Sequence, residues 1–266
     1  MEKKNIYNNF KNKVAIVTGG SEGIGFAVAR ALTKKGVKVL IVSRNKKKLQ
    51  LAKKKLSSKD AKIDFYVGDV SKKETASKVI NKCNKLWGKA DILINNAGGP
   101  PPGNLLNHKD VEWEKTINTN LLSVVRFSRS VIPSMKKKKW GRIISISSTI
   151  SKEPTPRMIL SATSRAGVAS FTKSLALEFA EFNITSNVIS VGGVLTKRLE
   201  QLIIKQAKNK NQKFNDLFFN IKNSIPAKRF AKPDEIASYV LFLCSEESAY
   251  INGQNLIIDG GLTKGY

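Results

Sequence analysis

The chain has 266 residues, 41% of them hydrophobic, with two cysteines and a formal net charge of +27. This length and apolar content fit one α/β domain with a real core, and they exclude a disordered chain. Two cysteines exclude a disulfide scaffold, and the lack of a ~18-residue apolar stretch or an N-terminal signal segment predicts a cytoplasmic protein without a membrane partner.

Apolar runs rich in Val and Ile alternate with helix-length segments along the chain. The apolar runs predict strands at 14–20, 38–44, 63–70, 90–98, 141–148, 184–190 and 254–261. Amphipathic segments predict helices at 26–36, 45–58, 72–87, 111–135, 160–182 and 233–245. Strands that alternate with helices form βαβ units. The sequence therefore predicts an α/β fold, a single-domain Rossmann-type doubly wound parallel sheet over residues 1–266.

The segment at about 193–230 is irregular in pattern and too long for a simple connection. Ligands of doubly wound sheets bind beyond the carboxyl ends of the strands, and long connections there often serve as lids. We therefore expect this segment to be a substrate lid. A basic lid suits an anionic substrate such as an acyl thioester on a phosphopantetheine arm, although a solvated lysine-rich helix explains the composition equally well. The basic residues are Lys197, Arg198, Lys205, Lys208 and Lys210.

A glycine-rich segment, Thr18-Gly19-Gly20-Ser21-Glu22-Gly23-Ile24-Gly25, joins the first predicted strand to the first predicted helix. Glycines let the backbone turn tightly and approach a pyrophosphate, and the helix N-terminus stabilises the negative charge of that group. The segment therefore predicts a phosphate-binding turn.

This turn resembles the TGxxxGIG turn of the short-chain dehydrogenase/reductase family. Four other segments resemble that family in the same order. They are Gly68-Asp69-Val70, Asn95-Asn96-Ala97-Gly98, Asn118-Thr119-Asn120-Leu121 and residues 225–261, the last of which is similar to the end of the 3-oxoacyl-carrier-protein reductase branch. The resemblance covers about residues 12–262 and implies a dinucleotide-binding oxidoreductase, with Asn120 among its catalytic residues.

The resemblance also implies which residues contact the cofactor. They are Thr18, Gly19, Ser21, Gly23, Ile24, Gly25, Arg44, Asp69, Val70, Asn96, Ala97, Gly98, Arg165, Gly192 and Thr196. Val191-Gly192-Gly193 stands where relatives usually have Pro-Gly.

The end of the second strand carries Ser43 and Arg44. An acid at this point binds the 2′-hydroxyl of NAD, whereas a nearby Arg accommodates the 2′-phosphate of NADP. We therefore expect NADP(H) to be favoured over NAD(H). Glu22 argues in the other direction, because NADP-binding relatives often carry a basic residue in the glycine-rich turn.

The catalytic motif of the family is altered in this chain. Family members hold the substrate carbonyl with a Ser, protonate it from a Tyr, and use a Lys four residues later to bind the nicotinamide ribose. Ser148 corresponds to that Ser, but the expected Tyr position is Ser161 and the expected Lys position is Arg165. No tyrosine occurs between Tyr66 and Tyr239, so a shift in alignment does not restore the motif.

Three interpretations of this altered site remain open. In the first, a carbonyl reductase stabilises the oxyanion with Ser148, Ser161 and Arg165, and a water held near Asn120 supplies the proton. In the second, an enoyl or enolate-forming substrate is protonated at carbon. In the third, the domain is a non-catalytic dinucleotide-binding subunit with a regulatory or structural role, because a serine hydroxyl is a far weaker acid than a phenol.

Partners follow from the same sequence. Helices 111–135 and 160–182 resemble those that pair between subunits in the family, which implies a homodimer or homotetramer.

Lysine runs at 46–48, 53–55 and 136–139 occur without any nucleic-acid motif, so we interpret them as solvated helix faces and expect no nucleic-acid partner. Two Cys and His108 cannot form a convincing zinc site, so no metal is expected.

Overall fold

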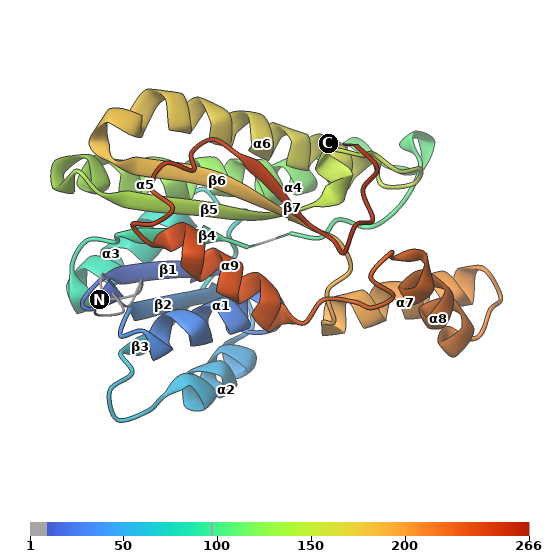
Figure 1. The fold of residues 1–266 in the computed structure, drawn as a ribbon, viewed down its shortest axis with the longest axis horizontal. Coiled ribbons are helices and arrows are strands. Elements are labelled where there is room, and N and C mark those ends of the chain that lie inside the picture. The colour runs from blue at the N-terminus through green and yellow to red at the C-terminus, as the bar shows by residue number, and fades with distance from the viewer. Residues whose placement is uncertain (1–9, 97, 266) are drawn as a thin grey trace, which may run out of the picture.

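A single parallel sheet of seven strands organises the chain (Figure 1). The computed structural model describes residues 10–96 and 98–265. The strand order is β3-β2-β1-β4-β5-β6-β7. The strands are β1 Val14–Thr18, β2 Lys38–Ser43, β3 Ile63–Val67, β4 Ile92–Asn95, β5 Gly141–Ser148, β6 Ile184–Val191 and β7 Asn255–Ile258. Each lies within its predicted range, except that β6 extends one residue further, to Val191, which confirms the Rossmann-type fold class.

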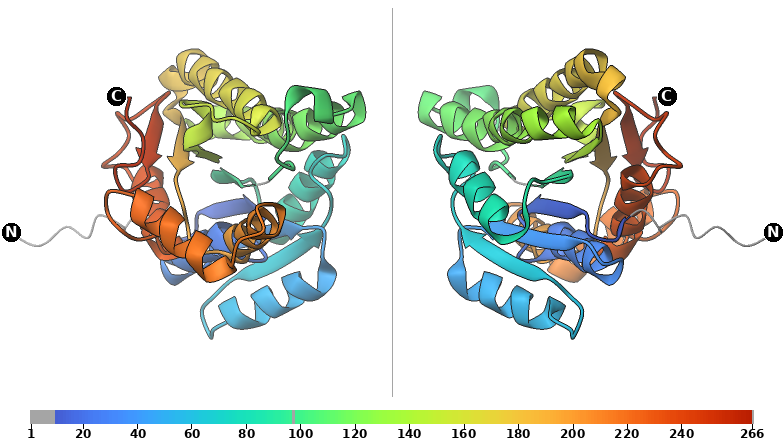
Figure 2. Two further views of the ribbon diagram at one scale, coloured as in Figure 1. Left: turned by 90° about the vertical axis from the view of Figure 1, so that its right-hand side faces the viewer. Right: turned by 90° about the vertical axis from the view of Figure 1, so that its left-hand side faces the viewer.

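Helices cover both faces of the sheet (Figure 2). They are α1 Gly23–Lys34, α2 Lys46–Leu56, α3 Thr75–Trp87, α4 Asp110–Thr116, α5 Ser123–Lys138, α6 Ile159–Phe179, α7 Lys197–Asn209, α8 Phe214–Ser224 and α9 Pro233–Cys244. One face packs against α1, α2 and α9, and the other against α3, α5 and α6. Because both faces are buried, the strands are continuous apolar runs rather than alternating ones.

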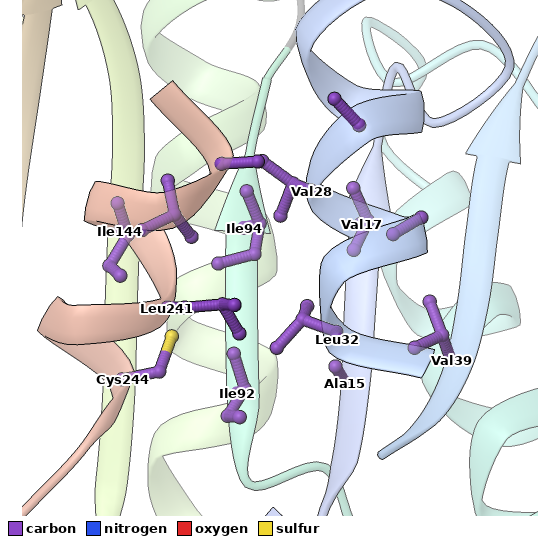
Figure 3. Packing of buried hydrophobic residues seen from close by; sticks show 14 of the residues in the cluster. Ala15, Val17, Val28, Leu32, Val39, Ile92, Ile94, Ile144, Leu241 and Cys244 are labelled. Carbon is purple, nitrogen blue, oxygen red and sulfur yellow. The ribbon is translucent and has the colours of Figure 1, made fainter. Parts of the chain in front are cut away.

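Successive residues of a strand pack into two different hydrophobic cores, one on each face of the sheet. Ala15 and Val17 of β1 face α1 and α9, where Leu32 and Leu241 pack beside them (Figure 3). Ile16, on the opposite face of the same strand, belongs to the core under α3 and α5. The two cores fix the position of the strand ends, where the site residues lie.

The helix predicted at 111–135 contains a π-helical turn. This turn, Ile117–Leu122, joins α4 to α5 without ending the helix. A π turn holds one more residue than an α turn and leaves the apolar periodicity on each side intact, so the sequence pattern does not show it. Asn120 lies inside the turn and is buried.

The segment at 193–230 is helical and not irregular as the sequence pattern indicated. Helices α7 and α8 occupy it and face the carboxyl end of the sheet (Figures 1 and 2). They share a small core of their own, in which Ile203, Leu217 and Phe230 are buried. The apolar partners of each helix lie within this same segment, which makes it a compact helical unit.

None of the helices within residues 10–96 and 98–265 is both long enough and apolar enough to cross a lipid bilayer.

Arg142 is fully buried at the end of the sheet opposite the glycine-rich turn. Its Nη1 donates to the carbonyl oxygen of Asn183 at 3.0 Å, and its Nη2 lies 3.4 Å from a Glu246 carboxylate oxygen. Its guanidinium carbon lies 4.6 Å from the centre of the Trp140 ring. These contacts join β5 to the segment after α9, so we expect this arginine to be a major contributor to stability.

Replacing Arg142→Ala removes a large buried side chain and leaves its polar partners without a donor, so we expect the free energy of unfolding to fall by about 3 kcal/mol. Chemical denaturation measures this change. Arg129, an exposed arginine of α5, is the matched control, and Arg129→Ala should change stability by less than about 0.5 kcal/mol. Equal effects of the two variants would contradict the assignment.

Candidate active site

The glycine-rich turn between β1 and α1 brings backbone segments into direct contact. Gly19 and Gly23 have φ values of +61° and +60°, which favour glycine. A Cβ on Gly19 would lie 1.9 Å from the carbonyl oxygen of Asn96, and a Cβ on Gly25 would lie 2.4 Å from the carbonyl oxygen of Gly19. Side chains are therefore excluded at Gly19 and Gly25, as a close approach of the backbone to a phosphate requires.

The ends of β1 and β4 are joined by hydrogen bonds at this turn. The Asn96 backbone N–H donates to Thr18 Oγ1 at 2.8 Å, and Asn96 Nδ2 donates to the carbonyl oxygens of Thr18 and Gly19 at 3.4 and 3.3 Å. The Glu22 side chain does not cap α1, so the first-turn N–H groups remain available to an anion. Thr18 and Asn96 thus hold the turn in place from within.

A second cluster follows β2 and β3. Lys48 Nζ lies 2.9 and 3.0 Å from the two carboxylate oxygens of Glu22, and Ser21 Oγ donates to Ser43 Oγ at 3.1 Å. Burial opposes ionisation of Asp69, but hydrogen bonds from Ser71 and the charge of Arg44 outweigh it, so the pKa of Asp69 lies below its usual value. Arg44 is exposed, so its charge stabilises the Asp69 carboxylate from the solvent side of the turn.

Asn120 lies between the segment after β4 and helix α6. Its Nδ2 donates to Ser164 Oγ at 2.9 Å, and Ser164 Oγ donates to the carbonyl oxygen of Leu160 at 2.7 Å. A Cβ on Gly98, whose φ is +98°, would lie 1.8 Å from Asn120 Oδ1. The π-helical turn, Gly98 and Ser164 therefore fix the Asn120 amide in one orientation.

Ser161 and Arg165 form a hydrogen-bonded pair one turn apart on α6. Arg165 Nε donates to Ser161 Oγ at 3.1 Å, and Arg165 Nη1 donates to the carbonyl oxygen of Ile146 at 3.4 Å. Burial lowers the pKa of Arg165 to about 10, and the positive charge of Arg198 acts in the same direction. Within the described ranges, no ion pair supplies Arg165 with a carboxylate.

A small polar cavity lies behind this pair. Its volume is about 10 Å³, which is enough for one water molecule. Asn120, Ser147 and Arg165 are among its lining residues. Ser147 Oγ is buried without a hydrogen-bond partner among the described residues, so a water in the cavity would satisfy it. Ser148, the last residue of β5, accepts a hydrogen bond from Ser151 at its carbonyl oxygen, at 2.9 Å.

The connection after β6 closes over the glycine-rich turn. The Gly192 N–H donates to the carbonyl oxygen of Ile258 at 3.0 Å. Thr196 caps α7 by accepting from the Leu199 N–H at 3.2 Å, and its Cγ2 lies 3.3 Å from where a Cβ on Gly23 would stand. The first turn of α7 is therefore positioned against the first turn of α1.

The structure brings the predicted site residues to the carboxyl edge of the sheet. At the last residue of a strand, in the turn that follows one, or in the first turn of α1 lie Thr18, Gly19, Ser21, Gly23, Ile24, Gly25, Arg44, Asp69, Val70, Asn96, Gly98, Ser148, Gly192 and Thr196. Asn120, Ser161 and Arg165 reach this edge from the helices. Ala97 lies outside the described residues.

Sequence reasoning did not single out Ser147 or Ser164. Ser164 follows Ser161 by three residues on the same helix, and this spacing could have indicated a shared buried face. His108 has a different environment, since its Nδ1 lies 3.3 Å from a Glu112 carboxylate oxygen and its side chain packs on Gly103.

A wider cavity of about 520 Å³ lies beside α6. Its lining residues include Gly103, Ser151, Pro154, Ile159, Ala162 and Ala166. Ala162 and Ala166 directly follow Ser161 and Arg165, so the cavity flanks the strip of α6 that carries this pair.

Comparison with known proteins gives consistent matches over nearly the whole chain. A family model described as short chain dehydrogenase matches residues 13–207. The chain is 36% identical over 254 residues to the 3-oxoacyl-[acyl-carrier-protein] reductase FabG of Escherichia coli, covering 96% of this chain and 98% of that protein. It is 34% identical over 255 residues to 2,3-dihydro-2,3-dihydroxybenzoate dehydrogenase of Bacillus subtilis, covering 96% and 97%.

Solved structures agree with these matches. L-sorbose reductase from Gluconobacter frateurii, complexed with NADPH and L-sorbose, has a TM-score of 0.91 at 30% identity and covers 96% of this chain and 98% of its own. An actinorhodin polyketide ketoreductase with NADPH has a TM-score of 0.92 at 30% identity and covers 95% and 98%.

Replacing Ser164→Ala leaves the buried Asn120 amide without its acceptor, so we expect a loss of about 1–2 kcal/mol in the free energy of unfolding. Chemical denaturation measures it. Ser174 of the same helix makes an equivalent hydrogen bond to the carbonyl four residues earlier but is exposed, so Ser174→Ala should cost less than about 0.5 kcal/mol. A cost for Ser164→Ala no larger than for Ser174→Ala would show that Asn120 is not held this way.

Proposed function

This chain belongs to the short-chain dehydrogenase family, and we propose that it is an NADP(H)-dependent carbonyl reductase that works with Ser161 and Arg165 in place of a tyrosine and a lysine. Its membership makes it an NAD(P)-dependent oxidoreductase by class. The observation that carries the finer proposal is the hydrogen bond from Arg165 Nε to Ser161 Oγ, in a chain whose glycine-rich turn leaves no room for side chains at Gly19 and Gly25.

The residues present fit a dinucleotide. Gly19, Gly23 and Gly25 leave a backbone surface on which a pyrophosphate can lie against the first turn of α1. In our proposal Asp69 receives the adenine amino group, and Thr196 approaches the nicotinamide amide. When bound, the nicotinamide supplies the hydride.

Charges around the turn support NADP(H) over NAD(H). The second strand ends in Ser43 rather than an acid, and the exposed Arg44 follows it. Glu22, the one acidic residue of the turn, is neutralised by Lys48. The solved reductases from Gluconobacter and the actinorhodin pathway were both determined with NADPH, which supports the same choice.

The site offers oxyanion stabilisation and a hydroxyl donor. Arg165 donates to Ser161 Oγ, so the Ser161 proton is free to be donated to a substrate oxygen. The guanidinium charge is partly buried, and a buried charge stabilises a developing oxyanion more than a solvated one does. In our proposal Ser148 holds the same oxygen, and a water in the cavity beside Asn120 and Ser147 restores the proton.

The substrate class we propose is a 3-oxoacyl-like carbonyl compound, covered by the lid formed by α7 and α8. The 36% identity to a 3-oxoacyl-[acyl-carrier-protein] reductase supports it.

We also propose that α5 and α6 pair with a second copy in a homodimer or homotetramer, and the exposed Leu177 on α6 supports an apolar contact there.

A second candidate function is a non-catalytic dinucleotide-binding subunit with a regulatory or structural role. The absence of any tyrosine between Tyr66 and Tyr239 favours it, because a serine hydroxyl is a much weaker acid than a phenol. The two functions differ in whether NADPH is consumed.

Replacing Arg44→Ala should weaken NADPH binding about 10- to 100-fold and leave NADH binding unchanged, because a hydrogen bond to a charged group contributes ~1.5–3 kcal/mol. Equilibrium titration of both nucleotides measures this. Lys47→Ala, a neighbouring exposed charge, is the control and should leave both affinities nearly unchanged. Equal weakening of both nucleotides by Arg44→Ala would contradict recognition of the 2′-phosphate.

NADPH oxidation with 3-oxoacyl and enoyl thioesters tests the catalytic proposal. We expect Ser161→Ala to lower kcat at least 10²-fold, the low end of the loss when a positioned acid is removed, with little change in NADPH affinity. Ser170→Ala, at an exposed serine of α6, is the control. In the double variant Ser161→Tyr with Arg165→Lys, a functioning native site predicts lower or redirected activity. New carbonyl reduction from an inactive parent would instead support the non-catalytic subunit.

A further inference from the structure

Arg126, in the first turn of α5, bridges two segments that lie far apart in the sequence. Its Nη1 donates to the carbonyl oxygen of Ser71 at 2.9 Å, and its Nη2 donates to Asn118 Oδ1 at 2.8 Å. Ser71 follows β3, and Asn118 is the second residue of the π-helical turn Ile117–Leu122. One guanidinium therefore joins the proposed adenine end of the cofactor site to the turn that carries Asn120.

On the adenine side, Ser71 is held at both of its backbone groups. Its N–H donates to Asp69 Oδ1 at 2.9 Å, and its carbonyl oxygen accepts from Arg126. The carbonyl oxygen of Asp69 accepts from Thr75 Oγ1, at the start of α3, at 2.6 Å. The Asp69 carboxylate, which receives the adenine amino group in the proposed function, is thus bonded to a residue that Arg126 holds.

On the other side, Asn118 connects the two α-helical parts that flank the π-helical turn. Its Nδ2 donates to the carbonyl oxygen of Glu114 in α4 at 2.9 Å, and its Oδ1 accepts from Arg126 in α5. Eight residues separate the two side chains, which is about 2.2 turns of an ordinary α-helix and would leave them about 80° apart around the axis. The π-helical turn holds a surplus residue in this interval, so the interval acts as about two turns and both side chains share one face.

Arg126 depends on these two acceptors. It is half-buried, and none of the ion pairs within residues 10–96 and 98–265 gives it an acidic partner. A guanidinium is planar, and its donors form a fixed fork. The two Nη groups therefore move together, and a shift of one acceptor displaces the group that holds the other.

We propose that Arg126 is a positioning residue that transmits occupancy of the adenine site to the π-helical turn, and through that turn to the Asn120 amide. This inference rests on the proposed function, which assigns the adenine amino group to Asp69 and places the reacting centre near Asn120. Another connection between the two ends runs through the contact of Gly19 with Asn96, and the experiment separates the two connections.

Hydrogen exchange followed by mass spectrometry tests the inference without turnover. The probes are AMP and adenosine 2′,5′-bisphosphate, which carry the adenine ends of NAD(H) and NADP(H) but no nicotinamide that could touch Asn120. The tighter-binding probe is added at saturation to the full chain. We expect it to slow exchange of the Ile117–Leu122 amides about threefold or more, because an adenine held at Asp69 stabilises the Ser71 carbonyl on which Arg126 depends.

Arg126→Met should abolish this ligand-dependent protection, and Arg126→Lys should restore part of it, because an ammonium keeps the charge without the planar fork. Asn118→Leu removes only the contact with the π-helical turn. It should abolish the protection while probe affinity stays within about threefold of native. Arg129→Met, at an exposed arginine three residues further along α5, is the matched control and should keep the protection. A purely structural role for Arg126 would change exchange equally with and without the probe.

Steady-state kinetics give a second measurement. At saturating NADPH, Asn118→Leu should lower kcat for reduction of a 3-oxoacyl thioester about tenfold with little change in the KM for NADPH. Arg126→Met should lower kcat and also raise that KM, because it releases the adenine side as well.

Four results would overturn the inference. In the first, a bound probe leaves exchange of Ile117–Leu122 unchanged in the native chain. In the second, the protection survives in Arg126→Met or in Asn118→Leu, which assigns it to the contact of Gly19 with Asn96. In the third, Arg129→Met removes it as fully as Arg126→Met. In the fourth, an active native enzyme keeps its kcat in Asn118→Leu.

Failure of the proposed function gives different results. If neither probe binds, the dinucleotide site is wrong and this inference is wrong with it. If NADPH is not oxidised while protection that depends on Arg126 persists, only the reductase proposal is wrong.

Discussion

The close approach of Gly19 and Gly25 to Asn96 is the constraint on which the site depends. A Cβ on Gly19 would lie 1.9 Å from the carbonyl oxygen of Asn96, and a Cβ on Gly25 would lie 2.5 Å from Asn96 Nδ2. No side chain therefore fits at either glycine. The contact holds the ends of β1 and β4 together and directs the N-terminus of α1 at the space above them. The segment after β4 then meets Asn120, and the start of α7 meets Gly23. The glycine-rich turn and the candidate site around Asn120 are therefore parts of one packed assembly.

In the proposed reductase, Ser161 and Arg165 would change the source of acidity. A tyrosine and lysine act as a titrating unit, whereas Ser161 and Arg165 combine a weak acid with a lasting positive charge. The Arg165 fork fixes Ser161 Oγ as an acceptor, and the low dielectric around the guanidinium increases its effect on a nearby oxyanion. In the proposed reductase such a site stabilises charge more than it shares a proton, and one water in the cavity beside Ser147 would assist the serine.

Much of the fold could be predicted from the sequence because local signals were strong. Val- and Ile-rich runs located every strand, and the spacing of glycines located the phosphate turn. The π-helical turn could not be found, since one extra residue preserves the apolar stripe on each side of it. Helices α7 and α8 were not placed because their apolar residues, such as Ile203 and Leu217, pack on each other rather than on the sheet, so they follow no pattern set by the main core. The contact of Arg198 with Gly99 and Pro100 depends on how the connection after β6 places α7 beside the segment after β4, which no local pattern encodes.

The π-helical turn at Ile117–Leu122 also carries a constraint on how this protein can change. The turn holds its surplus residue without breaking the helix, so losing one residue there would convert it into an ordinary α turn and leave the helix on each side in phase. Phe127 and Val131 would stay buried against the sheet. The amide of Asn120, which lies inside the turn, would instead lose its position beside Gly98 and Ser164. The residue count of this turn is therefore set by the orientation of one amide, and a deletion here would disturb the candidate site before it disturbed the fold.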